Sequence, residues 1–357
     1  MKFGELPMTA KEIAAKVNIS PSAVSLALNG RKGVSEETRA QVLALAQEYG
    51  LRKPRQRNTP EGTIALVVFR RYHWICNDNT FFTAIIESIG TACREENYAL
   101  QIIYFLDDED WDDQLHAIEA CGCSGVILLA TEMLEYEGVR FEKLRLPLVV
   151  LDNSFDSTPF HSVTINNTQG AGLAVRHVLE MGHRSIGFLW NNTGIRNFEE
   201  RHLGAYQAID TFNRSSADTP ASVIPVSAVF VGGSDVYPTM TDYLDTKPQL
   251  PTVFVADNDT IAIPCIQALQ DRGYRVPEDI SVIGFDNAAM SNLVNMQLTT
   301  IDVPKHFLGR AATQLLVSVI RNEVENTPMR ICANTTLIRR NTVGHAAGSA
   351  AQKKGNA

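Results

Sequence analysis

Polar side chains that follow short apolar runs are the residues of this chain best placed to bind a ligand. Asp152 ends the run PLVVLD and Asp286 follows VIGF. Carboxylates in these places could accept charge-assisted hydrogen bonds from ligand hydroxyl or amino groups, or they could cap the next turn. Asn258 follows TVFVAD, where its amide could donate and accept toward a ligand or cap the next helix.

Three larger side chains add to this candidate binding site. Arg201 lies in a helical segment, where its side chain could form a surface ion pair with Glu199 or Glu200. Its role as a ligand contact, in which the guanidinium fork would hold vicinal hydroxyls or a carboxylate, is implied only by the family resemblance described below. Phe81 and Phe82 begin an apolar helix, and we expect one ring in the core and the other as a stacking surface for a ring of the ligand.

The chain lacks the residue patterns of common enzymes and metal sites. It contains no G-x-S-x-G, no H-E-x-x-H and no Gly-rich phosphate loop after a strand. Its six cysteines fall mostly in apolar or helical stretches, and Cys121 and Cys123 are spaced too closely for zinc and lack a partner pair. The sequence therefore predicts binding without catalysis, with no metal and no cofactor.

Alternating strands and helices position these residues. From Thr63 onward, short apolar runs alternate with helical stretches, which is typical of parallel sheets covered on both faces. Two such sets fit two doubly wound α/β lobes, and ligands of these folds bind in the crevice at the carboxyl ends of the strands. The predicted strands are 63–69, 99–105, 125–130, 147–152, 185–190, 226–231, 252–256, 279–285 and 331–340. The predicted helices are 81–97, 111–120, 167–181, 197–212, 236–244, 260–272 and 304–321.

The length of the chain and its charge distribution indicate several domains, one of which binds nucleic acid. A chain of 357 residues is expected to form two or three domains. Residues 1–58 contain ten Lys/Arg and five Asp/Glu, a net charge of +5, whereas the remainder carries −13 within the total of −8. This split is typical of a protein whose basic end contacts phosphate. No apolar run could span a membrane and the start is no secretory signal, so we expect a cytoplasmic protein.

The residue pattern of the basic end predicts three short helices. Thr9 followed by Glu12 is a capping box, Ser20 before a proline and Ser35 are N-cap signals, and Asn18 sits where a tight turn needs a left-handed residue. Two helices joined by such a turn form a helix-turn-helix, whose second helix can enter the major groove. The alternative is a plain three-helix mini-domain. On the second helix Val24, Ala27 and Leu28 are predicted to face the core, and Pro21, Ser22, Ser25 and Leu26 to face outward.

These stretches resemble the lactose-repressor (LacI/GalR) family. In the head the matching residues are Ile13-Ala14, Val17, Ser20, Val24-Ser25, Leu28-Asn29-Gly30 and Val34 through Arg39. The body resembles the family's effector-binding core, which shares its fold with periplasmic sugar-binding proteins. Its matching stretches are 79–82, 163–167 with Gly170-Ala171, 182–186, 201–204, 256–259, 283–286 and 298–301. Asn166 stands where the family more often has Asp.

The resemblance implies a homodimer that binds a pseudo-palindromic operator and a small-molecule effector, by family preference a sugar. It implies base-edge contacts from Pro21, Ser22 and Leu26, although Leu26 replaces a frequent Arg and cannot make a bidentate guanine contact. Phosphate contacts or helix caps are implied at Thr9, Ser20, Ser25, Asn29, Arg31, Ser35 and Thr38. Effector contacts are implied at Phe81, Phe82, Asp152, Arg201, Asn258 and Asp286, with Arg201 pointing into the cleft.

The linker departs from the family pattern. The segment LRKPRQRNTPEG is shorter than the usual hinge, lacks its Ala-Ala-Arg-Ser-Leu run, and contains Pro54, which prevents a helix through its middle. We expect Arg52 and Lys53, with Arg55 and Arg57, to form a flexible basic arm on phosphates. The predicted domains are a helix-turn-helix head at 1–50, this linker at 51–62, a two-lobed effector-binding and dimerisation core at 63–343 and a disordered tail at 344–357.

The sequence thus predicts a ligand-responsive transcriptional regulator and no enzyme. A repressor of carbohydrate-utilisation genes is the first expectation. A regulator that uses a purine or another metabolite as corepressor remains an alternative. A solute-binding protein without DNA function is a second alternative, which would need an export signal and no head.

Overall fold

The structure is a computed structural model that describes residues 10–28, 33–48, 59–72, 80–216, 219–224, 226, 235–292, 297–324 and 327–346. The chain divides into two units, Met1–Pro60 and Glu61–Ala357. The first unit contains the predicted head. The second contains the predicted two-lobed core.

Three short helices make up the described part of the head. They are α1 (Ala10–Val17), α2 (Pro21–Leu28) and α3 (Glu36–Glu48). The Ser20 hydroxyl accepts a hydrogen bond from the Ala23 N–H at 3.1 Å, and the Ser35 hydroxyl accepts one from the Thr38 N–H, also at 3.1 Å. Asn18 adopts a left-handed φ of 55° between α1 and α2. The predicted caps at Ser20 and Ser35 and the predicted turn are confirmed, because each hydroxyl satisfies a helix N–H that has no partner within its helix. The predicted capping box at Thr9 lies outside the described residues.

A small apolar core decides which side of α2 faces outward. Val24, Ala27 and Leu28 are buried, as predicted, and they pack with Ile13 and Val42 of the neighbouring helices. Each of these five side chains is at most 5% exposed. The opposite side of α2 is therefore the one that the head can offer to a partner.

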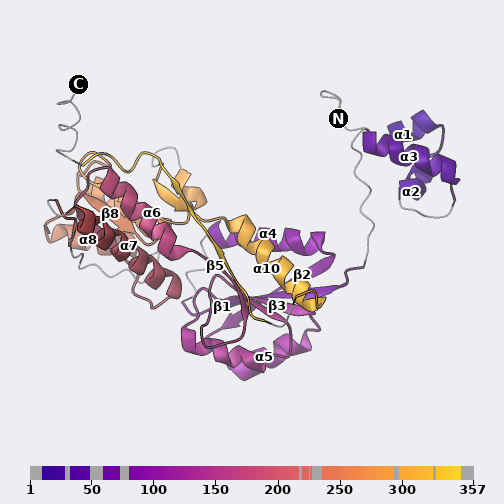
Figure 1. Cartoon of the computed structure of the whole chain (residues 1–357), viewed down its shortest axis with the longest axis horizontal. Helices are drawn as coiled ribbons and strands as arrows, with labels where there is room; N and C mark the ends of the chain where they lie inside the picture. The colour runs from indigo at the N-terminus through magenta and orange to yellow at the C-terminus, as the bar shows by residue number, and fades with distance from the viewer. Residues whose placement is uncertain are drawn as a thin grey trace. The chain divides into compact units, whose positions relative to one another are not determined.

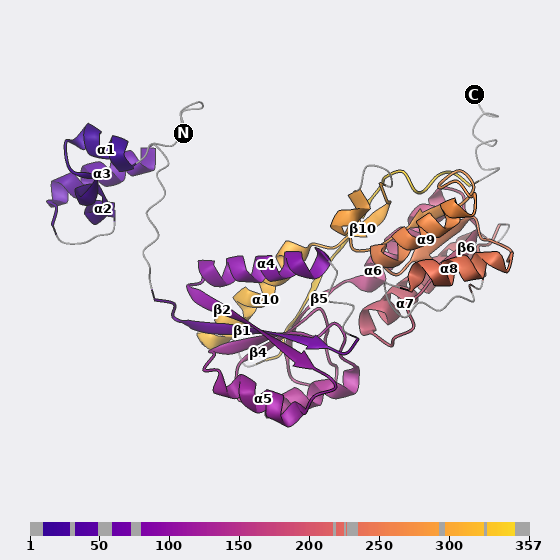
Figure 2. The same ribbon diagram turned by 180° about the vertical axis from the view of Figure 1, so that it is seen from behind.

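Six parallel strands form the sheet of the first lobe. Its strands are β1 (Gly62–Arg70), β2 (Tyr98–Leu106), β3 (Gly125–Leu129), β4 (Leu148–Leu151), β5 (His161–Ile165) and β11 (Arg330–Ala333), in the order β11-β5-β4-β3-β1-β2. One face is covered by α4 (Thr80–Glu95) and α10 (Lys305–Ile320) and the other by α5 (Trp111–Ala120), as Figures 1 and 2 both show. The short helix η1 (Glu135–Lys143) lies between β3 and β4 in the chain.

The sequence of β1 shows why helices cover both faces. Ile64, Leu66 and Val68 pack in the cluster that includes α4 and α10, whereas the alternating Val67 and Phe69 pack in the cluster that includes α5. Side chains of a strand alternate between the two faces of a sheet. A strand buried on both faces must be apolar at every position, so the continuous run TIALVVF is explained.

The second lobe repeats this plan with four parallel strands. The strands are β6 (Ser185–Leu189), β7 (Ser222–Ile224), β8 (Val253–Ala256) and β9 (Ser281–Ile283), in the order β7-β6-β8-β9. Its helices are α6 (Asn167–Glu180), α7 (Arg196–Ser215), α8 (Val236–Asp245) and α9 (Asp259–Asp271), followed by the short η2 (Ala289–Asn292). The prediction of two doubly wound lobes is confirmed. The strand predicted at 226–231 lies largely outside the described residues.

The segments that join the lobes differ from the prediction at one point. The sequence predicts one strand over 331–340, but β11 ends at Ala333 and β12 covers Thr336–Ile338, pairing antiparallel with β10 (Thr300–Asp302). The Gln169 side chain explains the break, because its Oε1 accepts from both the N–H and the hydroxyl of Thr335, at 3.0 and 2.8 Å. The Thr335 N–H is therefore bonded to a side chain and cannot donate to a neighbouring strand, as it would in a continuous strand.

The core also extends further than predicted at its C-terminal end. Gly344 and Ala346 belong to the predicted disordered tail, but the Ala346 N–H donates to the Met181 carbonyl at 3.0 Å and the Gly344 N–H donates to Ser281 Oγ at 3.0 Å. The tail boundary at 344 is therefore wrong, and the core reaches at least Ala346. The predicted tail beyond this residue lies outside the described part.

Candidate functional site

The outward side of α2 is small and polar. Pro21, Ser22 and Ser25 are exposed and Leu26 is half-buried. Leu26 leans on the turn that follows α2, since its Cδ1 lies 3.2 Å from where a Cβ on Gly33 would stand. Small side chains let a helix approach the base edges of the major groove closely, so base contacts by Pro21, Ser22 and Leu26 remain a prediction compatible with this surface.

Of the nine residues predicted to contact phosphate or cap a helix, four lie in the described part of the head, and one of these, Ser25, is exposed on the outward side of α2. Ser20 and Ser35 cap α2 and α3, and the Thr38 hydroxyl lies 2.7 Å from the Ser35 hydroxyl. These three residues mark helix N-termini, whose dipoles attract phosphate. The predicted contacts at Thr9, Asn29, Arg31, Arg52 and Lys53 lie outside the described residues.

In the second unit, Arg201 is the centre of a buried polar cluster. It lies on α7 and is 5% exposed. Its guanidinium donates to Asn167 Oδ1 at 2.9 Å, to Asp286 Oδ1 at 3.1 Å and to the Asp257 carbonyl. The ring of Phe285 lies beneath it, with its centroid 3.8 Å from Cζ. The alternative of a surface ion pair with Glu199 or Glu200 is therefore wrong.

Asp152 joins the cluster from the first lobe. It follows β4, and its carboxylate accepts from the Thr131 hydroxyl at 2.7 Å and from the Asn197 amide at 3.1 Å. Asn197 lies on α7, one helical turn before Arg201, so this hydrogen bond connects the two lobes. Burial raises the pKa of the Asp152 carboxyl to about 6, although both hydrogen bonds and the charge of Arg201 oppose the shift.

Two backbone strains accompany the cluster. Asp152 and Asp286 have φ values of +61° and +98°, a region that costs a non-glycine residue about 1–3 kcal/mol. Each strain sits at the carboxyl end of a strand and turns a carboxylate toward Arg201 or Asn197. Backbone strain of this kind is common at binding sites, where it fixes the direction of a side chain.

The other three predicted effector contacts take different positions. Asn258 is the N-cap of α9, where its Oδ1 accepts from the Ile261 N–H at 3.0 Å. Phe81 and Phe82 are each 4% exposed and pack edge to face, with centroids 5.1 Å apart. The expectation that one of the two rings forms an open stacking surface is wrong for this conformation. The interpretation of Asn258 as a cap is confirmed, and a ligand contact by its amide remains a prediction.

Sequence reasoning missed several members of the cluster. Thr131 and Asp257 directly follow the apolar runs GVILLA and TVFVA, which is the same signal that selected Asp152. Asn197 could have been found from its spacing, since residues four apart share one face of a helix. Asn167 begins α6 and gave no such signal. Burial raises the pKa of Asp257, whose carboxylate contacts His202 Nε2 at 3.0 Å.

A cavity lies beside the cluster. It has a volume of about 740 Å³ and is lined from the first lobe by residues including Glu135, Asn153 and Asp156, and from the second by residues including Arg196 and Glu200. Asn153 and Glu200 are the chain neighbours of Asp152 and Arg201. Cavities of about 300–1,000 Å³ are typical of small-molecule sites. Among the described residues that line this cavity, none is one of the six predicted effector contacts.

The raised pKa of Asp152 predicts how stability depends on pH. Between pH 4 and 6 the folded state holds a proton on Asp152 that the unfolded chain releases, so the free energy of unfolding falls as pH rises. Across this range the free energy of unfolding is expected to fall by about 3 kcal/mol. Denaturation of wild type and Asp152→Asn at pH 4, 5, 6 and 7 measures it. We expect the free energy of unfolding of wild type, relative to that of Asp152→Asn, to fall as pH rises.

The comparison between the two proteins is needed because buried histidines act in the opposite direction. Burial lowers the pKa of His161, His177 and His183, so their contribution to stability rises with pH. A wild-type profile alone mixes both effects. A constant difference between wild type and Asp152→Asn across these pH values would contradict the burial of an ionisable Asp152.

Two families of known proteins match the chain. Residues 9–52 match the family described as bacterial regulatory proteins, lacI family, and residues 175–343 match the periplasmic binding protein-like domain. Among curated relatives, the HTH-type transcriptional repressor PurR of Aliivibrio salmonicida is 27% identical, over 88% of this chain and 93% of its own. The ribose operon repressor of Haemophilus influenzae is 27% identical (93% and 97%), and the probable repressor ExuR of Bacillus subtilis is 26% identical (94% and 98%).

Solved structures share the fold. A transcriptional regulator CelR–cellobiose complex aligns with a TM-score of 0.66 at 23% identity, over 94% of this chain and 99% of that one. The lac repressor dimer bound to operator and the anti-inducer ONPF aligns with a TM-score of 0.66 at 21% identity, over 95% and 99%. Within the described residues, no helix has both the length and the apolar content to cross a bilayer.

Proposed function

Because the chain belongs to the LacI family of bacterial regulatory proteins, we propose that it is a transcriptional repressor that releases or takes hold of its operator when a small molecule binds between its lobes. The first candidate effector is a sugar, and the first candidate targets are carbohydrate-utilisation genes. A relative named the ribose operon repressor supports this choice. A role on chromosomal DNA would place the protein in the bacterial cytoplasm.

The observation that carries the proposal is the polar cluster around Arg201. Asp152 from the first lobe and Arg201 from the second are linked by hydrogen bonds through Asn197 and Asn167, and Arg201 is paired with Asp286. Carboxylates, amides and a guanidinium that already hydrogen-bond one another can exchange those bonds for the hydroxyls of a ligand. A ligand that prefers one spacing of the lobes would then shift the population of the two shapes.

A homodimer is the form in which such a protein can hold DNA. A single head buries only about 600–1,000 Å² on DNA and binds weakly alone. Two heads on a two-fold dimer reach two half-sites of a pseudo-palindrome about 34–36 Å apart. The effector acts by changing how well the two heads match this spacing, with a coupling of about 1–3 kcal/mol. We infer that the ligand is released unchanged, so that the protein is no enzyme.

The ligand class is tested by a thermal-shift screen of sugars and nucleobases on the full chain. A ligand at 100 times its dissociation constant stabilises the folded state by about 2.7 kcal/mol, which raises the melting temperature measurably. We expect a sugar to do so. If a purine base raises the melting temperature and no sugar does, the effector class is a purine instead of a sugar. Failure of both classes would overturn the proposed effector chemistry.

A further inference from the structure

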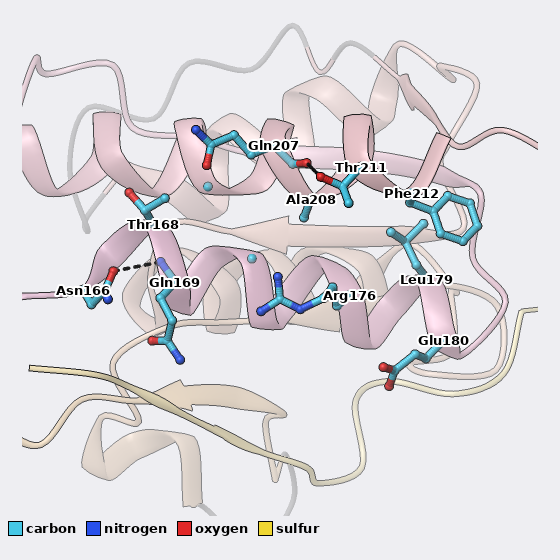
Figure 3. A pocket seen from close by; sticks show the side chains of 12 residues that line it. Asn166, Thr168, Gln169, Arg176, Leu179, Glu180, Gln207, Ala208, Thr211 and Phe212 are labelled. Atoms are coloured by element: carbon cyan, nitrogen blue, oxygen red, sulfur yellow. Dashed lines mark hydrogen bonds between the residues drawn. The ribbon is translucent and has the colours of Figure 1, made fainter. Parts of the chain in front are cut away.

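A second hollow lies between α6 and α7 on the solvent side of the second lobe (Figure 3). Its volume is about 590 Å³, within the range of about 300–1,000 Å³ that is typical of ligand pockets. It shares only Thr168 with the described lining of the interlobe cavity. This α6–α7 groove is lined by residues that include Gln169, Gly172, Arg176, Gly204, Gln207 and Phe212.

Small residues at fixed positions create the hollow. A Cβ on Gly204 would lie 2.2 Å from the Thr168 carbonyl oxygen, so the two helices touch backbone to backbone at this point. Along the groove from there, Gly172 and Ala208 carry too little side chain to fill the space between the helices. The groove is thus formed by helical residues of the packed lobe, which keeps its shape fixed before any ligand arrives.

Arg176 places an exposed positive charge in the groove. Its Nη1 lies 3.0 Å from where a Cβ on Gly172 would stand, so the exposed guanidinium lies over Gly172, and Figure 3 shows the side chain along α6. Among the residues that the structure describes, Arg176 has no hydrogen bond and no ion pair. Glu180, which also lines the groove, lies instead 3.7 Å from Arg339. An unpaired guanidinium presents two parallel N–H donors that match a carboxylate.

The far end of the groove is apolar. Leu179 and Phe212 line it, and both pack against the main core of the molecule. The guanidinium of Arg184 lies over the Phe212 ring, with Cζ 4.5 Å from the centroid, which holds the ring in place. The groove therefore offers a cationic centre and an apolar end within one cavity.

We propose that the α6–α7 groove is a second ligand site that binds a small organic acid with an apolar body. The carboxylate pairs with Arg176, the body packs against Leu179 and Phe212, and the Gln207 amide adds a hydrogen bond. Such a ligand contacts the same two helices that Arg201 and Asn167 join at 2.9 Å on the inner side of the lobe. The groove is separate from the effector cluster, so the proposal stands independently of the proposed function.

Ligand-detected NMR on the full chain tests the site, with phenylacetate and 3-phenylpropionate as probes and their amides as neutral controls. We expect saturable binding of the carboxylates and binding of the amides that is weaker by about tenfold or more, since a hydrogen bond to a charged group is the stronger kind. Arg176→Gln should weaken carboxylate binding by a similar factor. Gly172→Leu should abolish it, because the new side chain fills the groove.

Two controls keep the result interpretable. Arg214→Gln removes the same charge from an exposed arginine of α7 that is paired with Asp210, and it should bind the probes like wild type. Gln207→Trp blocks the groove from an exposed position and replaces Gly172→Leu if that variant does not fold. The proposal is overturned if no carboxylate binds saturably, if acids and amides bind equally, or if Arg176→Gln and Arg214→Gln have the same effect.

Discussion

Replacing Arg201 by Ala is expected to lower the free energy of unfolding of the two-lobed unit by about 3–5 kcal/mol, the cost of breaking a buried ion pair from one side. Arg201 and Asp286 have side chains that are only 6% and 8% exposed. Without the guanidinium, the Asp286 carboxylate stays buried and unpaired, and Asn167 loses its donor. Chemical denaturation of wild type and Arg201→Ala measures the loss. The variant should also lose any effector-dependent change in melting temperature.

Two controls separate the buried pair from a general effect of removing charge. The double variant Arg201→Met with Asp286→Asn removes both charges and should recover much of the lost stability, because no unpaired charge remains. Arg214→Ala breaks the exposed pair with Asp210 and should cost only about 0–1 kcal/mol. A loss for Arg201→Ala as small as that for Arg214→Ala would mean that the pair with Asp286 does not form in solution.

The second large effect is expected on the outward side of α2, where Ser22→Glu should weaken operator binding by about 100-fold, because placing like charges against each other in an interface costs several kcal/mol. Ser22 is exposed and lies in the first turn of α2. A carboxylate there would lie inside the major groove, between the phosphates of the two strands, when the helix enters it. The same carboxylate is favourable for the helix itself, since acidic residues stabilise a helix N-terminus. Fluorescence anisotropy with labelled operator duplex measures the change, and a melt of the variant checks its fold.

Gln41→Glu is the matched control for Ser22→Glu. It adds the same charge at an exposed position of α3, the helix that is not predicted to enter the groove. We expect it to weaken DNA binding only slightly, through the net charge of the head. If both variants weaken binding equally, α2 is not the recognition helix and only the charge of the head matters.

Local signals in the sequence were sufficient where the structure depends on neighbouring residues. The caps at Ser20 and Ser35 and the left-handed turn at Asn18 each depend on contacts within three or four residues, and all three are confirmed. Helix α5 begins and ends at the predicted residues for the same reason, because Asp110 caps it locally. A local rule also identified Asn258 as a helix cap.

Contacts between residues far apart in the sequence could not be predicted from local patterns. Asn197 and Asp152 are 45 residues apart and in different lobes, so only the folded chain shows that they bond. The break between β11 and β12 depends on Gln169, 166 residues before Thr335. Phe81 and Phe82 are predicted to divide between core and cleft, but both pack inward, because their rings meet edge to face. The sequence pattern identified the strand ends that carry binding residues, but it did not show which of these side chains hydrogen-bond to one another.

The central claim is that a ligand held between the lobes controls how the heads bind DNA. Its most direct test is the titration of a labelled duplex from upstream of the gene with the purified chain, at low and at physiological salt, with and without the ligand found in the thermal-shift screen. We predict two chains per duplex, affinity that falls as salt rises, and a change of about 5- to 150-fold on adding the ligand. The absence of binding at low salt under either condition would contradict the role on DNA. An affinity that the bound ligand leaves unchanged would contradict the coupling.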